Sequence, residues 1–204
     1  MATPVAPPPP KREEDEPGYH LHDTLYLRMS LGAGWVSTRI ESDAGDMRVK
    51  GAGTGLDLLL GGTPTPGLVL GGGIFAVSAN DPRIESGGQS DELAGDASTT
   101  LVGPFIDVYL DAKSGFHFGG ALGFSTFQIK PDDSDSDIGE KPYNGGGVVV
   151  FTGYDAWISP NWSLGGYVRF LGARGKRERE VASDTLDEQA TSAGFSILFT
   201  ALYH

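Results

Sequence analysis

A chain of 204 residues with a net charge of −12 and no cysteine is long enough for one domain. Its acidity excludes the basic surface that binds nucleic acid, and the lack of cysteine excludes disulfides and thiolate metal sites. A membrane-spanning helix needs about 18 apolar residues in a row, whereas the stretch 68–77 is interrupted by glycines at 71–73. The 31 glycines, roughly twice the average usage, weigh further against a helical fold.

The first 22 residues differ in composition from the rest of the chain. Residues 2–10 are rich in Ala, Thr and Pro, and a charged run at 11–16 follows. Such a segment cannot bury enough apolar surface to fold, so we expect a disordered tail over 1–22 and one folded domain over 23–204. Neither residues 2–10 nor the charged run 11–16 contains the apolar core of a secretory signal peptide. Because an exported protein needs one, we expect that a signal peptide has been removed.

From residue 24 onward, alternation of apolar with polar or small residues predicts about eight strands. They lie within 25–35, 52–61, 68–79, 102–110, 116–125, 148–156, 162–170 and 195–203. Short connections rich in Pro, Gly and Asn are found at 63–67, 111–115 and 159–161, and long charged ones at about 41–48, 80–98, 131–142 and 174–190. Short turns at one rim and long charged loops at the other predict an all-β, antiparallel up-and-down β-barrel.

The charged residues in the middle of these strands all fall on one face of the alternation. They are Arg28, Asp57, Asp107, Asp155 and Arg169, and His117 shares their face. The opposite face carries no charged residue and is rich in large apolar side chains. Its aromatic members are Trp35, Phe116, Phe118, Phe124, Trp162, Phe170, Phe195, Phe199 and Tyr203.

Such a sheet can close in two ways. In a soluble, lipocalin-like barrel the apolar face would point inward, and the second face, poor in charge, would meet water. In a membrane barrel the apolar face meets lipid, where Arg or Lys at the midplane would cost about 2–4 kcal/mol. Because soluble surfaces carry many charged residues, the pattern favours a transmembrane barrel. The aromatic residues are then expected to face lipid, and the charged ones to fill the lumen.

With these features, residues 24–204 resemble the small eight-stranded outer-membrane proteins of the OmpA, OmpX and OmpW kind. The resemblance rests on alternating strands, alternating loop lengths and an aromatic-rich last strand with Phe195, Phe199 and Tyr203. It implies residence in the bacterial outer membrane, contact with its lipid and lipopolysaccharide, and insertion by the barrel-assembly machinery. That machinery recognises an aromatic residue at the end of the last strand, and here His204 follows Tyr203. Members of the family are envelope anchors, adhesion or resistance factors and, in some cases, narrow pores.

The charged residues of the predicted lumen are the strongest candidate site. Closure brings the first and last strands together, so Arg28 and Arg169 are expected to pair with Asp57, Asp107 and Asp155. Unpaired charges in a confined interior are costly, which favours a network that fills the lumen. We therefore expect a monomeric barrel with a structural or surface-interaction role. A narrow gated pore for small solutes and a soluble ligand-binding barrel remain alternatives.

Catalysis and metal binding have weaker support in the sequence. Barrel enzymes that modify lipid A use Ser, His and acidic groups near one rim. Of the four histidines, His20 and His22 lie in the tail and His204 at the end, which leaves His117 as a packed lumen residue. The acidic run 131–137 lacks the glycine and the bidentate Glu of an EF-hand loop. We expect a solvated loop there, and neither enzyme activity, metal nor cofactor.

Overall fold

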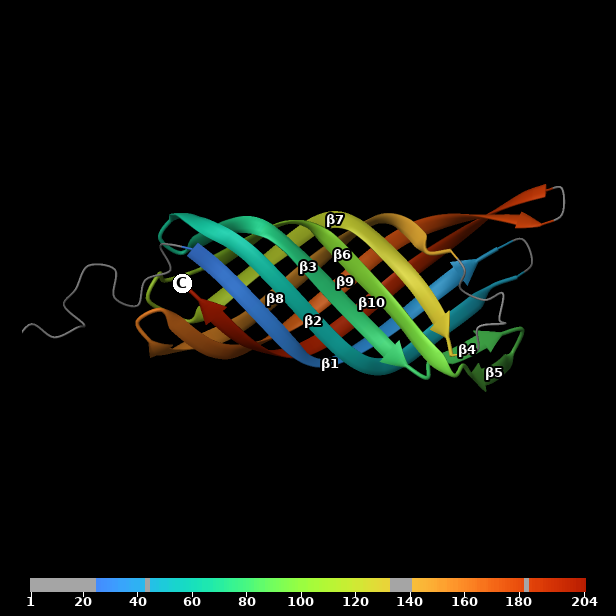
Figure 1. The fold of residues 1–204 in the computed structure, drawn as a ribbon, viewed down its shortest axis with the longest axis horizontal. Helices are drawn as coiled ribbons and strands as arrows, with labels where there is room; N and C mark the ends of the chain where they lie inside the picture. The colour runs from blue at the N-terminus through green and yellow to red at the C-terminus, as the bar shows by residue number, and fades with distance from the viewer. Residues whose placement is uncertain (1–24, 43–44, 133–140, 182–183) are drawn as a thin grey trace, which may run out of the picture.

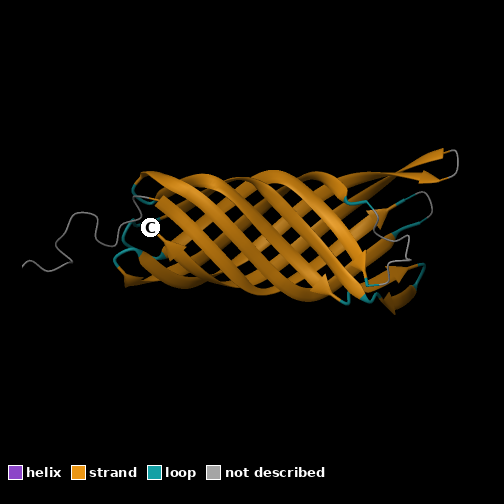
Figure 2. Ribbon diagram, in the orientation of Figure 1, coloured by secondary structure: helices purple, strands orange, loops and turns teal. Residues whose placement is uncertain are grey.

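The computed structural model describes residues 25–42, 45–132, 141–181 and 184–204. Within these ranges the chain consists of strands joined by turns (Figure 2), and no helix there is both long and apolar enough to cross a membrane. The expected tail over 1–22 and most of the acidic run 131–137 lie outside the described residues. The strands are β1 (Leu25–Glu41), β2 (Met47–Thr65), β3 (Leu68–Asn80), β4 (Arg83–Ser86), β5 (Gln89–Glu92), β6 (Gly95–Tyr109), β7 (Phe116–Pro131), β8 (Tyr143–Ser159), β9 (Trp162–Val181) and β10 (Asp184–Tyr203).

Eight of the strands formed by the described residues close into one barrel (Figure 1). They follow one another as β1, β2, β3, β6, β7, β8, β9 and β10, every neighbouring pair is antiparallel, and β10 pairs back with β1. The β1–β10 ladder is regular from Leu27↔Tyr203 to Glu41↔Gln189. The predicted all-β, up-and-down barrel of eight strands is confirmed. Closure leaves the barrel without an unpaired edge.

The two rims differ in the length of their connections. At one rim, short turns follow Thr65, Tyr109 and Ser159, where the sequence predicts them. Gly67 has a φ of +82° and its carbonyl accepts a hydrogen bond from the amide of Tyr109, so a residue without a side chain suits this turn. The C-terminus lies at this rim in Figure 1. We call it the turn rim, and the opposite end the loop rim.

At the loop rim, the prediction of a long loop is wrong for two segments, 80–98 and 174–190. Residues 80–98 contain the hairpin β4–β5, which adds to the loop-rim end of β2 through the pairs Met47↔Ser86 to Lys50↔Arg83. Residues 174–190 belong largely to β9 and β10, which stay paired as far as Val181↔Asp184 and extend past their neighbours in Figure 1. Charged composition indicates contact with water, and a paired strand that continues beyond the apolar part of the barrel meets water equally well.

The period-two pattern explains which side chains point into the barrel. Tyr26, Leu59, Phe75, Leu101 and Leu198 are buried in one apolar cluster in the lumen. A second cluster, with Ile40, Val49, Phe127, Ile129 and Tyr143 among its members, lies toward the loop rim. Both sets alternate along their strands with outward-facing residues. The barrel is therefore filled by side chains, and its charged residues must be accommodated between them.

Candidate functional site

All six polar residues predicted to face the lumen are buried. Arg28, Asp57, Asp107, His117, Asp155 and Arg169 come from β1, β2, β6, β7, β8 and β9, and each is at most 1% exposed. The structure brings them together in two groups. We call the group around Arg28, with Asp107, His117 and Asp155, the Arg28 cluster. We call Arg169 with Asp57 the Arg169 pair.

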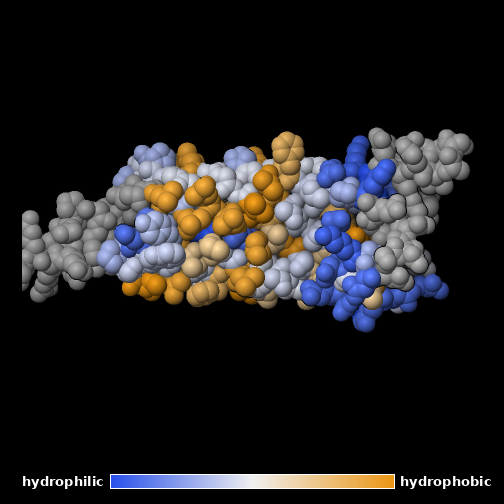
Figure 3. Space-filling model, viewed as in Figure 1, coloured by the Kyte–Doolittle hydropathy of each residue, from blue (hydrophilic) through white to orange (hydrophobic). Residues whose placement is uncertain are grey.

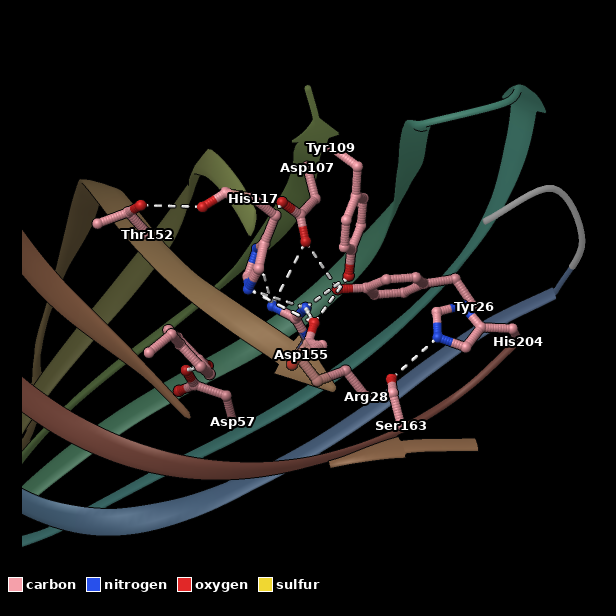
Figure 4. Close-up of polar contacts among 11 residues, drawn as sticks. Tyr26, Arg28, Asp57, Asp107, Tyr109, His117, Thr152, Asp155, Ser163 and His204 are labelled. Carbon is pink, nitrogen blue, oxygen red and sulfur yellow. Dashed lines mark hydrogen bonds and ion pairs between the residues drawn. The ribbon is translucent and has the colours of Figure 1, made fainter. Parts of the chain in front are cut away.

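The Arg28 cluster lies across the lumen near the turn rim (Figure 4). The guanidinium of Arg28 donates to Asp155 Oδ2 at 2.6 Å, and its Nη1 lies 3.4 Å from Asp107 Oδ2. It also donates to the hydroxyl of Tyr109 at 2.9 Å. These partners sit on β6 and β8, which are not neighbours of β1. The cluster thus ties opposite walls of the barrel to each other.

His117 and two tyrosines complete the Arg28 cluster. His117 Nδ1 lies 2.9 Å from Asp107 Oδ1, and because a carboxylate only accepts, the proton of this contact belongs to the imidazole. Tyr26 donates to Asp107 at 2.8 Å, and Tyr109 donates to Asp155 at 2.9 Å while its ring stacks on that of His117. Each carboxylate thus accepts from several groups. This is how charges taken out of water are stabilised.

The Arg169 pair is a separate group. Arg169 and Tyr167 both donate to the carboxylate of Asp57, which faces them from β2. The second guanidinium nitrogen of Arg169 donates to the carbonyl of Ala76 at 2.9 Å and to the hydroxyl of Ser196 at 2.8 Å. One positive and one negative charge are thus matched here.

A third polar group in the lumen was not predicted from the sequence. Arg177 of β9 lies 2.5 Å from Glu188 of β10, and its guanidinium stands 4.3 Å above the ring of Tyr143. Tyr143 also donates to Glu188, at 2.6 Å. The period-two pattern of β9 leads from Tyr167 and Arg169 to Arg177, so continuing the alternation through the charged segment finds this residue.

The nine predicted lipid-facing aromatics all lie on the outside of the barrel. Seven of them are at least 43% exposed, and Phe124 reaches 86%; Phe195 and Tyr203 are partly covered. Exposed Leu, Ile, Val or Met side chains come from seven of the eight barrel strands in the described residues, for example Met29, Leu58 and Leu122. Figure 3 shows the apolar side chains along the middle of the barrel and hydrophilic ones toward the end that carries β4 and β5. We call this zone of exposed apolar side chains around the middle of the barrel the apolar belt.

The chemistry available in the lumen is limited by access. His117 and Asp107 resemble the base and its orienting acid in a hydrolase, but neither has accessible surface. A substrate cannot reach them unless the Arg28 cluster opens. Among the described residues, no group of three or more His, Asp or Glu side chains is arranged to hold a metal ion.

Comparison with solved structures shows which known proteins share this fold. No protein-family model matches the sequence, and no curated protein resembles it in sequence. The outer membrane protein OprG from Pseudomonas aeruginosa superposes with a TM-score of 0.58 at 14% identity, covering 93% of this chain and 100% of that one. The fold is that of a small outer-membrane β-barrel. The outer membrane protein AlkL, solved in DMPC bilayers, gives a TM-score of 0.55 at 11% identity over 98% of this chain and 96% of its own.

Proposed function

We propose that the protein is an integral barrel of the bacterial outer membrane with a closed lumen, and that it serves the envelope structurally or through its loop rim. The observation that carries this proposal is the inverted polarity of the barrel. Arg28, Asp107 and Asp155 are fully or almost fully buried, whereas Leu110, Leu122 and Phe124 are 65% or more exposed. Monomeric soluble proteins rarely expose apolar surface of this extent.

The closed lumen supports a role without large conductance. Eight strands leave an interior just wide enough for side chains. Here Tyr26, Tyr109, Tyr167 and Arg28 occupy it with at most 3% exposure. The apolar exterior likewise weighs against a soluble ligand-binding barrel. The buried His117 weighs against an enzyme that modifies lipids.

A narrow gated pore is the second candidate, and the geometry of the Arg28 cluster favours it over the others. Two of the ionic contacts in the cluster are long: Arg28 to Asp107 at 3.4 Å and His117 Nε2 to Asp155 at 3.5 Å. Contacts of this length are weaker than the 2.6 Å contact between Arg28 and Asp155, so they would be the first to separate if the lumen opened. Conductance in planar bilayers separates the two candidates, because a closed lumen predicts no large, steady current.

Assembly into the membrane is the remaining part of the proposal. The last strand, β10, presents Phe195, Phe199 and Tyr203 on its outer face. This arrangement supports recognition by the barrel-assembly machinery. The final residue, His204, is turned inward instead: its ring packs 4.2 Å from that of Trp157, and Nε2 lies 3.0 Å from the hydroxyl of Ser163. Tyr203 is therefore the last outward aromatic residue of the strand.

The purified protein tests membrane residence directly. We expect it to require detergent or lipid for solubility and to migrate faster on gels before boiling than after, as a barrel that stays folded in detergent does. A chain that remains monodisperse at high concentration in plain buffer, with no shift on heating, would contradict the proposal and support a soluble barrel.

A further inference from the structure

The outer wall of β7, β8 and β9 is hollowed at the loop-rim edge of the apolar belt. Two adjoining grooves, of about 740 and 390 Å³, meet at Gly146. Their walls include Leu122, Phe124, Val148 and Arg174. A Cβ built on Gly146 or Gly172 would approach other atoms of the protein no closer than 3.8 Å. The space above these two glycines is therefore open to whatever surrounds the barrel.

The register of the strands places an aromatic ring and a cation on either side of this floor. Phe124 of β7 pairs with Gly146 of β8, which pairs with Arg174 of β9. Directly opposed residues of antiparallel strands lie about 4.5–5.5 Å apart at Cβ, so all three belong to one outward row. Lys176 follows Arg174 on the same outward face, and both are exposed. Apolar surface thus gives way to positive charge within one groove.

These two cations differ from most others at the loop rim. Arg39 pairs with Glu41 and Asp46, Lys50 with Glu85, and Arg83 with Glu92. Within the part of the chain whose side chains are described, no ion pair joins Arg174 or Lys176 to an acidic residue. In a chain with a net charge of −12, these two exposed cations place positive charge on the outer wall beside the groove, which suits an anionic ligand.

We propose that this groove binds a phosphorylated, acylated glycolipid of the outer leaflet, that is, lipopolysaccharide through its lipid A part. An acyl chain lies over Gly146 and Gly172 against Phe124, and a lipid A phosphate is bound by Arg174 and Lys176. Arginine forms bidentate contacts with phosphate, and lysine adds a point charge. The inference rests on the proposed membrane function with the loop rim outward, because only that orientation brings these residues to the outer leaflet.

The test uses the full chain folded in detergent micelles and bisphosphorylated lipid A as the probe, with bound lipid counted by native mass spectrometry. We expect the double variant R174E/K176E to weaken binding by about tenfold or more, since two charge-assisted contacts are lost. G146L should weaken it comparably by filling the groove. The controls are R48E/K130E, which reverses two other charges at the loop rim, and G72L, which adds a side chain at an outward glycine with nothing within 4 Å.

Equal binding by the parent, R174E/K176E and G146L would overturn the inference, as would displacement of lipid A by phosphatidylglycerol at equal concentration. Heat-dependent gel mobility is measured for every variant, so that a failure to fold is seen separately. A protein that needs no detergent would contradict the proposed membrane function itself. Normal insertion with unchanged lipid A binding would contradict the groove alone.

Discussion

The Arg169 pair shows how a single buried charge depends on its partner. Arg169 and Asp57 are both buried, with Tyr167 as a further donor to the carboxylate. Removing one member of a buried pair leaves an uncompensated charge, whereas replacing both members with apolar residues of similar size is often neutral or stabilising. The cost of a substitution here should therefore depend on which charge remains.

We expect R169M to destabilise the barrel by about 3–5 kcal/mol and the double variant R169M/D57L to recover most of that loss. Recovery stays incomplete because Tyr167 loses its acceptor. The measurement is equilibrium urea unfolding in lipid vesicles, followed by tryptophan fluorescence. If the double variant is as unstable as R169M, the charge of Asp57 is not what the arginine stabilises.

At the scale of the strands, the charged residues that the period-two pattern places on one face are all buried inside the barrel, because the side-chain period of a strand is fixed by its geometry. The pattern does not predict which arginine meets which aspartate. Arg28 contacts residues of β6 and β8 across the lumen, and such contacts depend on strand tilt and stagger, which the sequence does not state. The sequence does not predict the extensions of β9 and β10 as strands, for another reason. Their charged residues indicate water, and water is compatible with both a loop and a strand.

Glycines at two neighbouring strands have opposite tolerance for a side chain. A Cβ on Gly103 of β6 would lie 2.0 Å from the carbonyl oxygen of Leu122 and 2.7 Å from Cα of Gly123, both backbone atoms of β7. A Cβ on Gly72 of β3 would meet nothing within 4 Å. We expect G103A to lose about 1–3 kcal/mol, since the strands must move apart, and G72A to stay close to the parent. Equal yields of the heat-shifted folded band for both variants would contradict the close contact of β6 and β7.

The hairpin β4–β5 should respond to acid. Lys50 of β2 lies 2.6 Å from Glu85 of β4, and this hydrogen bond holds the pKa of Glu85 below its usual value. A depressed folded-state pKa stabilises the docked hairpin above the unfolded value of about 4.3, and the effect is lost as pH falls through the lower folded-state pKa. We expect the protection of the β4 amides against exchange, corrected for the pH dependence of the intrinsic rate, to fall over that window. E85Q should show less change with pH, and identical profiles for parent and variant would exclude the ion pair as the cause.

At the scale of the whole molecule, the barrel wall and its contents are coupled. Most of the barrel strands contribute a residue to the Arg28 cluster or the Arg169 pair. Arg28 of β1 alone contacts acidic residues of β6 and β8 and so links three strands. A solute that crossed the lumen would have to separate these groups from their partners, and each separation exposes a charge in a confined space. The closed state is therefore the stable state, and opening requires the loss of several contacts at once.

This coupling leads to a prediction for planar bilayers. We expect the parent protein to show no large, steady conductance, only silence or small, rare openings. R28A removes the group that spans the lumen and leaves Asp107 and Asp155 without their guanidinium, so openings should become more frequent. The matched control is R39A, because Arg39 is a half-exposed arginine at the loop rim of the same strand. Steady, large currents from the parent would mean that the lumen is wide and hydrated, and the gated pore would then replace the closed barrel as the leading function. Equal opening frequencies in R28A and R39A would instead show that the path is blocked elsewhere, with the apolar cluster around Phe75 and Leu101 the next segment of the lumen to test.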